Sequence, residues 1–356
     1  GLRAVTEALG RRGISGTVAS SPHCATMYEI SLIPQSCPQV SIIIPTKNGL
    51  ADLKNCVDSL VKRTNYPCYE IVVLDNQSDD PELLQYLRDA EARTNLRTIR
   101  YEAPFNHSDM NNLAVATCSS DYVVLMNNDV EILSDNWLET MMATLQLNDS
   151  IAGVGAKLLY PDRTIQHAGM LLGIGGLAGH AHRFVADDDP GYLCRASLLN
   201  EFSGATAALL LLKKSAFEEV SGFDAESFPT SFNDADLWLR LQQAGYRCLY
   251  NPRVKAIHFE SKTRRTPRDL ESEYETRLKH RWASQLANDP FYSPNLGLDN
   301  EIFMDHRPNP IDLEALLKDL FHSGKQSDLH APASQRTKPQ ESLAGFNSFA
   351  PSHPES

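Results

Sequence analysis

Between residues 40 and 126, short apolar strands alternate with amphipathic helices, and this alternation limits the fold more than any other feature of the chain. The strands are continuous hydrophobic runs, which is typical of strands buried on both faces. The helices space their apolar residues three and four positions apart, as Leu53, Val57 and Leu60 illustrate. Strands joined by crossover helices form βαβ units, so the pattern predicts an α/β domain with a mostly parallel central sheet. The predicted strands cover residues 40–45, 70–75, 96–101 and 121–126, and the predicted helices cover residues 52–62, 81–92 and 107–117.

This half of the chain looks like a nucleotide-binding unit, but it lacks two common glycine-rich signatures. No G-x-G-x-x-G follows the first predicted strand, and the chain has no G-x-x-x-x-G-K-[ST]. Dinucleotide-dependent dehydrogenases and P-loop proteins therefore lose their main sequence support. A nucleotidyltransferase stays open as an alternative, although residues 45–49 do not supply the glycine-rich, basic phosphate loop expected of one.

The composition indicates the cellular compartment and excludes some classes of partner. The 356 residues, 42% of them apolar, suffice for one large α/β domain with appendages or for two modest domains. A net charge of −12 argues against nucleic acid as a partner and against an anionic membrane as the main one. The seven cysteines include no C-x-x-C pair, which favours reduced thiols over a disulfide framework or a zinc site. No apolar run approaches the roughly 18 residues of a membrane span, so we expect a cytoplasmic protein.

Polar residues cluster where the fourth predicted strand ends. The apolar run over residues 122–126 leads directly into Asn127, Asn128, Asp129 and then Glu131. Ligands of open α/β sheets bind beyond the carboxyl ends of the strands. Asp129 and Glu131 offer hard oxygen ligands, which suit Mg²⁺ or Mn²⁺ carrying a nucleotide diphosphate. The alternative is a polar turn in which Asn and Asp serve the backbone conformation alone.

Two further polar clusters follow the first and second predicted strands. Thr46 and Asn48 lie directly after the first strand, where a plain strand–loop–helix turn is the simpler interpretation. Asp75 ends the second strand, and its carboxylate could accept a hydrogen bond from a nucleoside base or ribose. Residues 78–80 can be explained by capping of the helix that begins at Pro81, but Asp75 lies too early in the sequence to cap it.

A helix predicted over residues 235–244 begins with another pair of carboxylates. One of Asp234 and Asp236 can cap this helix, while the other faces a pocket as a candidate general base. His258 follows a strand-like run over residues 254–257, and a lone histidine is usually a surface or core residue. Because no carboxylate is spaced to complete a metal site with them, three other histidines are interpreted as loop residues: His167, His180 and His182.

In their order along the chain, these clusters resemble the inverting family 2 glycosyltransferases, which have the GT-A fold. The resemblance covers residues 38–263 and is closest to the rhamnosyltransferase-like group of bacterial polysaccharide assembly, whose domains are often fused in tandem. It implies transfer of a sugar from a nucleotide-diphosphate sugar to a glycan or a lipid-linked acceptor. The segments that carry it are residues 40–48, 71–79, 105–114, 125–131, 204–213, 232–246 and 250–258.

The resemblance also implies roles for single residues. Asp129 corresponds to the last aspartate of the family's metal motif, and Glu131 and His258 are implied as further ligands of Mn²⁺ or Mg²⁺. Asp234 corresponds to the catalytic base, which takes a proton from the acceptor hydroxyl. The implied contacts to the nucleotide sugar are Pro45, Thr46, Asn48, Asp75, Asn112, Asn128, Asp129, Gly204 and Ala205.

The chain departs from the family pattern at two positions. Asn127 stands where the metal motif has its first aspartate, so one potential ligand is neutral, and Glu131 could supply the missing charge. Asn233 stands where the family has an acid before the catalytic base. These departures leave open a catalytically idle domain that binds nucleotide sugar within a larger assembly protein.

The predicted organisation has three parts. Residues 1–38 form a lead-in with a short helix over residues 5–12, and residues 39–285 form the catalytic domain. Residues 286–356 form an extension that is largely irregular, with one short amphipathic helix over residues 311–321 and disorder from about residue 323. The chain begins Gly-Leu-Arg-Ala rather than with Met, as a piece of a longer polypeptide would. A lipid-linked acceptor would place it at the inner face of the cell membrane without an anchor of its own.

Overall fold

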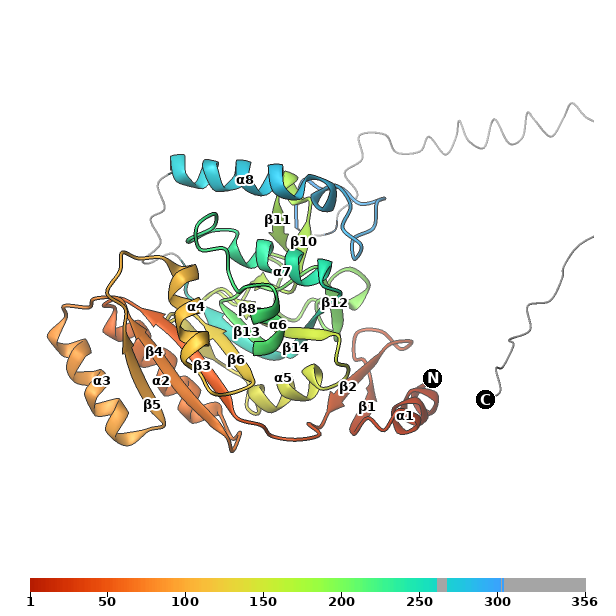
Figure 1. Cartoon of the computed structure of the whole chain (residues 1–356). Helices are drawn as coiled ribbons and strands as arrows, with labels where there is room; N and C mark the ends of the chain where they lie inside the picture. The colour runs from red at the N-terminus through yellow and green to blue at the C-terminus, as the bar shows by residue number, and fades with distance from the viewer. Residues whose placement is uncertain (261–267, 302, 304–356) are drawn as a thin grey trace, which may run out of the picture. The chain divides into compact units, whose positions relative to one another are not determined.

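A central sheet organises the residues that this computed structural model describes, which are 1–260, 268–301 and 303 (Figure 1). Three neighbouring pairs at one end of the sheet are parallel, as the βαβ pattern predicts, whereas the other half is mixed. In the order in which they lie side by side, the strands are β12 (Asn200–Phe202), β14 (Arg247–His258), β8 (Ile151–Leu159), β13 (Leu209–Lys213), β6 (Tyr122–Met126), β3 (Val40–Thr46), β4 (Tyr69–Asp75) and β5 (Leu96–Arg100).

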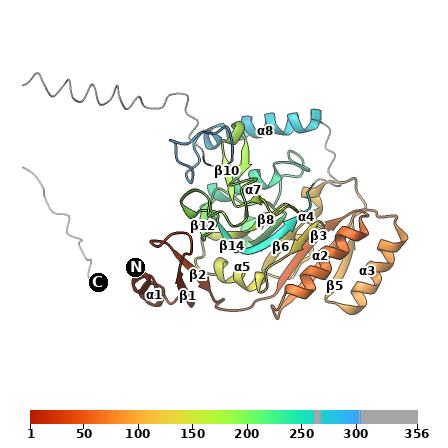
Figure 2. The same ribbon diagram turned by 180° about the vertical axis from the view of Figure 1, so that it is seen from behind.

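Helices cover both faces of this sheet, as the opposite views in Figures 1 and 2 show. One face packs against α2 (Leu50–Arg63), α3 (Pro81–Arg93) and α5 (Trp137–Leu145). The other face packs against α4 (His107–Thr117), α6 (Lys214–Glu219), α7 (Asn233–Gln243) and α8 (Arg268–Leu286). In β3, Ile42 and Ile44 belong to the first core and Ile43 to the second, which explains why the strands are apolar at every position.

The α/β architecture agrees with the predicted fold class, and the predicted elements from β3 to β6 agree with the structure to within two residues. The strand predicted over residues 254–257 is much longer, because β14 runs for 12 residues with an irregularity between Asn251 and Lys255. The short strand β7 (Val130–Ile132), which pairs with β14, went unpredicted, and another short strand, β9 (Ile165–His167), pairs with β8.

The first residues hold more structure than the predicted lead-in. The predicted short helix is α1 (Leu2–Arg11), and it is followed by a separate antiparallel hairpin of β1 (Gly16–Ser20) and β2 (Tyr28–Leu32). At the other end, Asp289 accepts a hydrogen bond from the Leu172 main-chain N–H at 2.6 Å, so packing continues beyond residue 285. The helix predicted over 311–321 and the disorder predicted from 323 lie outside the described residues. Among the described helices, none combines the length and the apolar character that crossing a bilayer requires.

Candidate active site

Asp129 and His258 face each other beyond the carboxyl end of β6. Their side chains are each 12% exposed, and 3.2 Å separates Asp129 Oδ1 from His258 Nε2. The two residues are far apart in sequence, but β7 follows Asp129 immediately and pairs antiparallel with the end of β14, where Val130 lies opposite His258. The main-chain N–H of Phe259 also donates to the main-chain oxygen of Asp129 at 3.0 Å. Strand pairing therefore brings the predicted metal ligand and the late histidine together.

The Asp129–His258 pair fits one edge of a divalent-cation site. Two ligands at about 2.1 Å from an octahedral ion lie about 3 Å apart, which is close to the separation of these two atoms. Such ions commonly keep only one or two protein ligands and complete their shell with substrate phosphates and water. Among the described residues, no group of three or more His, Cys, Asp or Glu side chains has metal-binding geometry. The pair is thus suited to a metal that arrives with a diphosphate.

Two neighbours of this pair differ from expectation. Glu131, predicted as a third ligand, does not join Asp129 and His258 in a three-residue group. Because β7 lies beside α2, the Glu131 carboxylate instead accepts a hydrogen bond from Asn55 Nδ2 at 3.3 Å. Asn127 does lie with the pair, and its Nδ2 is 3.1 Å from His258 Nε2. Asn127, the neutral residue of the altered metal motif, thus contacts His258.

The ends of β3, β4 and β6 meet at the same edge of the sheet, and hydrogen bonds join the loops that follow them. Asn128 Nδ2 donates to Thr46 Oγ1 at 2.9 Å, which connects the loop after β6 to the end of β3. The Asn48 side chain binds the loop after β4, accepting from the Asp79 main-chain N–H at 3.1 Å and donating to the Asp79 carboxylate at 2.9 Å. Pro45 pairs with Leu74 in the same register. Four of the predicted nucleotide contacts therefore lie along one edge.

Asp75 also lies at this edge, but its carboxylate is buried and bound by other residues of the chain. Its side chain is 2% exposed, and it forms an ion pair with Arg100, whose own side chain is 43% exposed. Its other oxygen accepts a hydrogen bond from the Ser78 main-chain N–H at 3.1 Å. The hydrogen bond to Asp75 raises the pKa of Arg100, since it favours the charged guanidinium. A contact between Asp75 and a nucleoside would have to be made beside Arg100.

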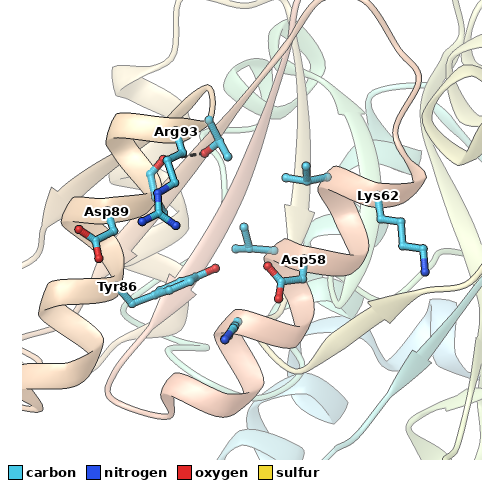
Figure 3. A pocket seen from close by; sticks show the side chains of 10 residues that line it. Asp58, Lys62, Tyr86, Asp89 and Arg93 are labelled. Atoms are coloured by element: carbon cyan, nitrogen blue, oxygen red, sulfur yellow. Dashed lines mark hydrogen bonds between the residues drawn. The ribbon is translucent and has the colours of Figure 1, made fainter.

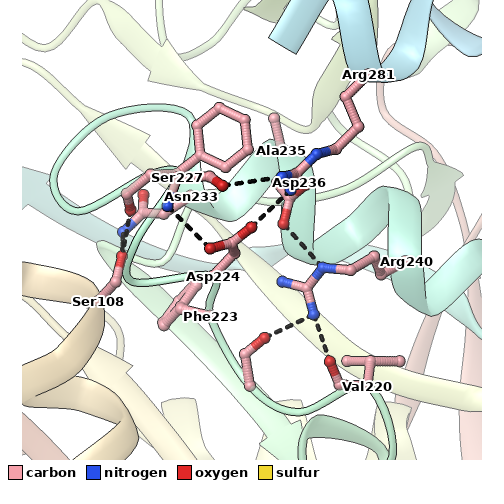
Figure 4. Close-up of polar contacts among 12 residues, drawn as sticks. Ser108, Val220, Phe223, Asp224, Ser227, Asn233, Ala235, Asp236, Arg240 and Arg281 are labelled. Atoms are coloured by element: carbon pink, nitrogen blue, oxygen red, sulfur yellow. Dashed lines mark hydrogen bonds and ion pairs between the residues drawn. The ribbon is translucent and has the colours of Figure 1, made fainter. Parts of the chain in front are cut away.

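The two carboxylates at the start of α7 have separate environments. Asp236 is fully buried and accepts hydrogen bonds from Arg240 and from Arg281 of α8 (Figure 4). It also accepts one from Trp282 of α8, so its role is structural. Asp234 is half-buried, and its Oδ1 accepts from the Ala235 main-chain N–H at 2.8 Å. Phe232 occupies the cap position in a left-handed conformation without a side-chain cap bond. Of the two carboxylates, Asp234 is the less buried, which makes it the candidate base.

Asn233 connects α7 to α4. Its Nδ2 lies 3.1 Å from Ser108 Oγ (Figure 4) and 3.2 Å from His107 Nδ1. The residue that departs from the family pattern is therefore used to fix the helix start that carries Asp234. Asn112 also has a structural role, and its side chain forms no hydrogen bond with the other predicted nucleotide-binding residues, all of which the structure describes. Both ends of its amide bind the main chain of Phe223, at 2.8 and 2.9 Å.

Gly204 and Ala205 lie directly under α7. Trp238 Nε1 donates to the main-chain oxygen of Ala205 at 2.8 Å. A Cβ atom added at Gly204 would come within 2.6 Å of Trp238 Cδ1, so only glycine permits this approach of backbone and indole. The next residue, Thr206, has its main-chain N–H 3.3 Å from His167 Nε2. The segment predicted to line the sugar pocket is thus fixed between α7 and β9.

We expect Gly204→Ala to lower the free energy of unfolding by about 2 kcal/mol, because the added methyl group must displace the buried Trp238 ring. Urea unfolding measures this loss. Gly10→Ala is the matched control, since a Cβ there meets nothing within 4 Å and alanine favours the helix by at most about 1 kcal/mol. Equal stability of Gly204→Ala and the wild type would contradict the packing argument.

Two histidines interpreted as loop residues, the buried His167 and the half-buried His180, form a pair near the site. His167 Nδ1 and His180 Nδ1 are 2.8 Å apart, and the rings meet edge to face. Burial lowers the pKa of His167 well below its ordinary value, with further contributions from His180 and His258. Sequence reasoning missed this pair because β9 and β11 (Ala178–His180) are only three residues long, too short to show a period.

A surface hollow between α2 and α3 contains none of the predicted site residues (Figure 3). Its lining carries charges of both signs, among them Asp58, Lys62, Asp89 and Arg93, together with Tyr86. Nothing in this mixture selects a nucleotide, and we assign it no part in the site.

The fold has counterparts among solved structures. The crystal structure of GalNAc-T7 with UDP, GalNAc and Mn²⁺ superposes with a TM-score of 0.57 at 15% sequence identity, covering 70% of this chain and 50% of that one. At this identity the likeness shows the GT-A fold alone.

Curated relatives come from bacteria. The chain is 32% identical over 307 residues to the O-antigen biosynthesis protein RfbC of Myxococcus xanthus, covering 84% of this chain and 23% of that protein. It is 25% identical over 264 residues to the O-antigen chain rhamnosyltransferase RfbN of Salmonella typhimurium, covering 70% and 75% of the two chains. The two relatives matched over the largest share of this chain are much longer than it, and the chain spans 34% and 23% of their lengths.

The match to a family model covers the strands and loops described above. The model for glycosyl transferase family 2 aligns with residues 41–220, half of the chain, from β3 through α6. With the GT-A fold and the relatives in polysaccharide synthesis, the match is decisive: this chain belongs to glycosyl transferase family 2.

Proposed function

We propose that this chain is an inverting glycosyltransferase of the hexosyl- or rhamnosyltransferase type. It transfers a sugar from a nucleotide-diphosphate sugar to a hydroxyl of a glycan or lipid-linked acceptor in bacterial surface-polysaccharide synthesis. The observation that carries the proposal is the Asp129–His258 pair, whose 3.2 Å separation suits a divalent cation at the edge where nucleotides bind. Family membership favours glycosyl transfer over the nucleotidyl transfer that the sequence left open.

The donor would lie across the carboxyl ends of β3, β4 and β6. Pro45, Thr46, Asn48 and Asn128 would position the nucleotide, since the bonds among their loops make this edge rigid before the donor arrives. Asp75 would meet the nucleoside beside Arg100, and Gly204 and Ala205 would border the sugar. Rigid positioning of both reactants is a major part of such catalysis.

Asp129 and His258 would hold Mn²⁺ or Mg²⁺, which when bound offsets the charge that builds on the leaving diphosphate. Asp234 would accept the proton of the acceptor hydroxyl as that oxygen bonds to the anomeric carbon and the bond to the diphosphate breaks. A single displacement from the opposite face inverts the configuration at that carbon. Asn233 would act indirectly, by fixing the start of α7 through Ser108.

The setting of the enzyme is proposed from its relatives. The names of RfbC and RfbN concern O-antigen synthesis, which supports a saccharide acceptor carried on a lipid at the inner face of the cell membrane. Relatives several times longer than this chain support operation beside further glycosyltransferase domains.

Thermal unfolding with a panel of nucleotide diphosphates, with and without Mn²⁺, tests the proposal. We expect one nucleotide to stabilise the protein in the presence of Mn²⁺, by about 2.7 kcal/mol at one hundred times its Kd. Asp129→Ala should abolish the metal-dependent part of this stabilisation. Asp149→Ala is the control, because that side chain is fully exposed and lies at the start of β8, away from the cluster.

Each other outcome is informative. A stabilisation that is independent of Mn²⁺ would contradict the metal site but keep nucleotide binding. No stabilisation by any nucleotide diphosphate would contradict donor binding itself. Mn²⁺-dependent binding without any release of nucleotide diphosphate from the donor would favour the idle nucleotide-sugar-binding domain.

A further inference from the structure

We infer that Gln166 is a positioning residue, which holds His258 in the tautomer whose Nε2 lone pair points toward Asp129. Gln166 lies on β9 and is 4% exposed, and no motif in the sequence selects it. The inference rests on the proposed function, because it concerns the histidine proposed to bind the cation. It adds a residue to the site that neither the family resemblance nor strand-end reasoning selects.

The orientation of the Gln166 amide follows from its two other partners. Its Nε2 lies 3.0 Å from Glu260 Oε2 and 3.3 Å from the main-chain oxygen of His258. Both partners are acceptors, so the NH₂ end of the amide must face them. The carbonyl end, Oε1, is thereby directed at His258 Nδ1, at a distance of 2.7 Å.

This arrangement determines where the imidazole carries its hydrogen. An amide oxygen only accepts, so His258 Nδ1 must be the protonated nitrogen of the neutral ring. Nε2 then keeps its lone pair, and two groups lie around it: Asn127 Nδ2 at 3.1 Å and Asp129 Oδ1 at 3.2 Å. The Asn127 amide can donate to this lone pair, whereas the Asp129 carboxylate cannot.

A lone pair and a carboxylate oxygen at this distance repel each other unless a positive charge lies between them. Gln166 therefore prepares both atoms for a cation in advance. Partners on the far nitrogen of a metal-binding histidine typically change metal affinity by about 10- to 100-fold. The same logic gives Asn127 a role, since its amide hydrogens satisfy Nε2 when no cation is bound.

The test compares Gln166→Leu, which removes all three hydrogen bonds of the Gln166 amide at similar volume, with the exchange Gln166→Glu plus Glu260→Gln. The exchange keeps an acceptor toward Nδ1, a bond between residues 166 and 260, and the total charge. We expect Gln166→Leu to weaken Mn²⁺ binding at least tenfold, measured by electron paramagnetic resonance with nucleotide diphosphate present, and the exchange to restore it. Gln242→Leu is the control, because it removes a comparable bond, from Gln242 Nε2 to the Ser203 main-chain oxygen at 2.9 Å, and because its helix, α7, contributes no residue to the Asp129–His258 pair.

A second readout needs no metal. In ¹⁵N-histidine NMR of the metal-free protein, we expect His258 to be protonated at Nδ1 in the wild type and in the exchange, and to shift toward Nε2 protonation in Gln166→Leu. Protonation of His258 at Nε2 in the wild type, or identical tautomers in wild type and Gln166→Leu, would overturn the inference. A wild type that binds no Mn²⁺ would contradict the proposed metal site, while the tautomer would still report on Gln166.

Discussion

Asp234→Asn should remove nearly all sugar transfer while leaving donor binding in place. Asparagine has the shape of aspartate and can still accept the hydrogen bond from the Ala235 main-chain N–H. It cannot take a proton from an acceptor hydroxyl at neutral pH. Because a general base contributes about 10²- to 10⁴-fold to a rate, we expect a loss of about 10³-fold in turnover. Release of nucleotide diphosphate from the donor measures the rate, and thermal shift measures nucleotide binding.

The control for this prediction is Asp149→Asn, the same chemical change at a fully exposed aspartate, which should leave both quantities unchanged. Near-normal turnover of Asp234→Asn would rule out Asp234 as the base. Loss of nucleotide binding together with turnover would instead assign Asp234 a role in binding the donor.

Strand-end reasoning selects Asp129 because its signal is local. A buried parallel strand must end at the edge where ligands bind, and the residues directly after β6 can be named from the sequence alone. Thr46, Asn48 and Asp75 were placed at the same edge by the same reasoning. Strand-end reasoning does not predict the environment of Asp75. The residues around Asp75 in the sequence do not indicate that Arg100, on the neighbouring strand, binds one of its carboxylate oxygens.

Contacts across the sheet could not be derived in this way. His258 meets Asp129 only because β7 pairs with β14, and a three-residue strand carries no detectable period. The same pairing beside α2 directs Glu131 to Asn55 rather than into a group with Asp129 and His258. Gln166 was invisible for the same reason, because β9 is also three residues long. The family resemblance supplied His258, and residue patterns alone would not have done so.

The helix α8 was missed although a signal for it exists. Most of its residues are polar, so the usual amphipathic pattern is weak. Tyr274, Leu278, Trp282 and Leu286 nevertheless recur every four residues, and all four are buried against the second core. A narrow apolar stripe predicts a helix packed on the core even in a highly charged segment, provided that the stripe contains large side chains. Its partner, the carboxylate of Asp236, could be identified only from the folded chain.

Asp236→Ala should be among the most destabilising single changes in the chain. Asp236 is fully buried and accepts from Arg240 at 2.8 Å, from Arg281 at 2.9 Å and from Trp282 Nε1 at 2.9 Å. Removing one member of a buried charged group costs about 3–5 kcal/mol, because the remaining charges stay desolvated without a partner. The two arginine side chains are 20% and 34% exposed and can partly regain water, so we expect about 3 kcal/mol by urea unfolding.

Asp224→Ala provides the comparison, because Asp224 binds the same Arg281 at 2.8 Å from a position that is 27% exposed. Burial opposes ionisation of Asp224, but the Ser227 N–H and Arg281 outweigh it and lower its pKa to about 2. Ionised Asp224 therefore contributes stability fully above its ordinary pKa of 3.8, and this is lost as the pH falls through about 2. At pH 7 we expect Asp224→Ala to cost at most about 1 kcal/mol, and its difference from the wild type should shrink in acid. If Asp236→Ala were no more costly than Asp224→Ala, the junction of α7 and α8 would depend on apolar packing around Trp282 rather than on the buried carboxylate.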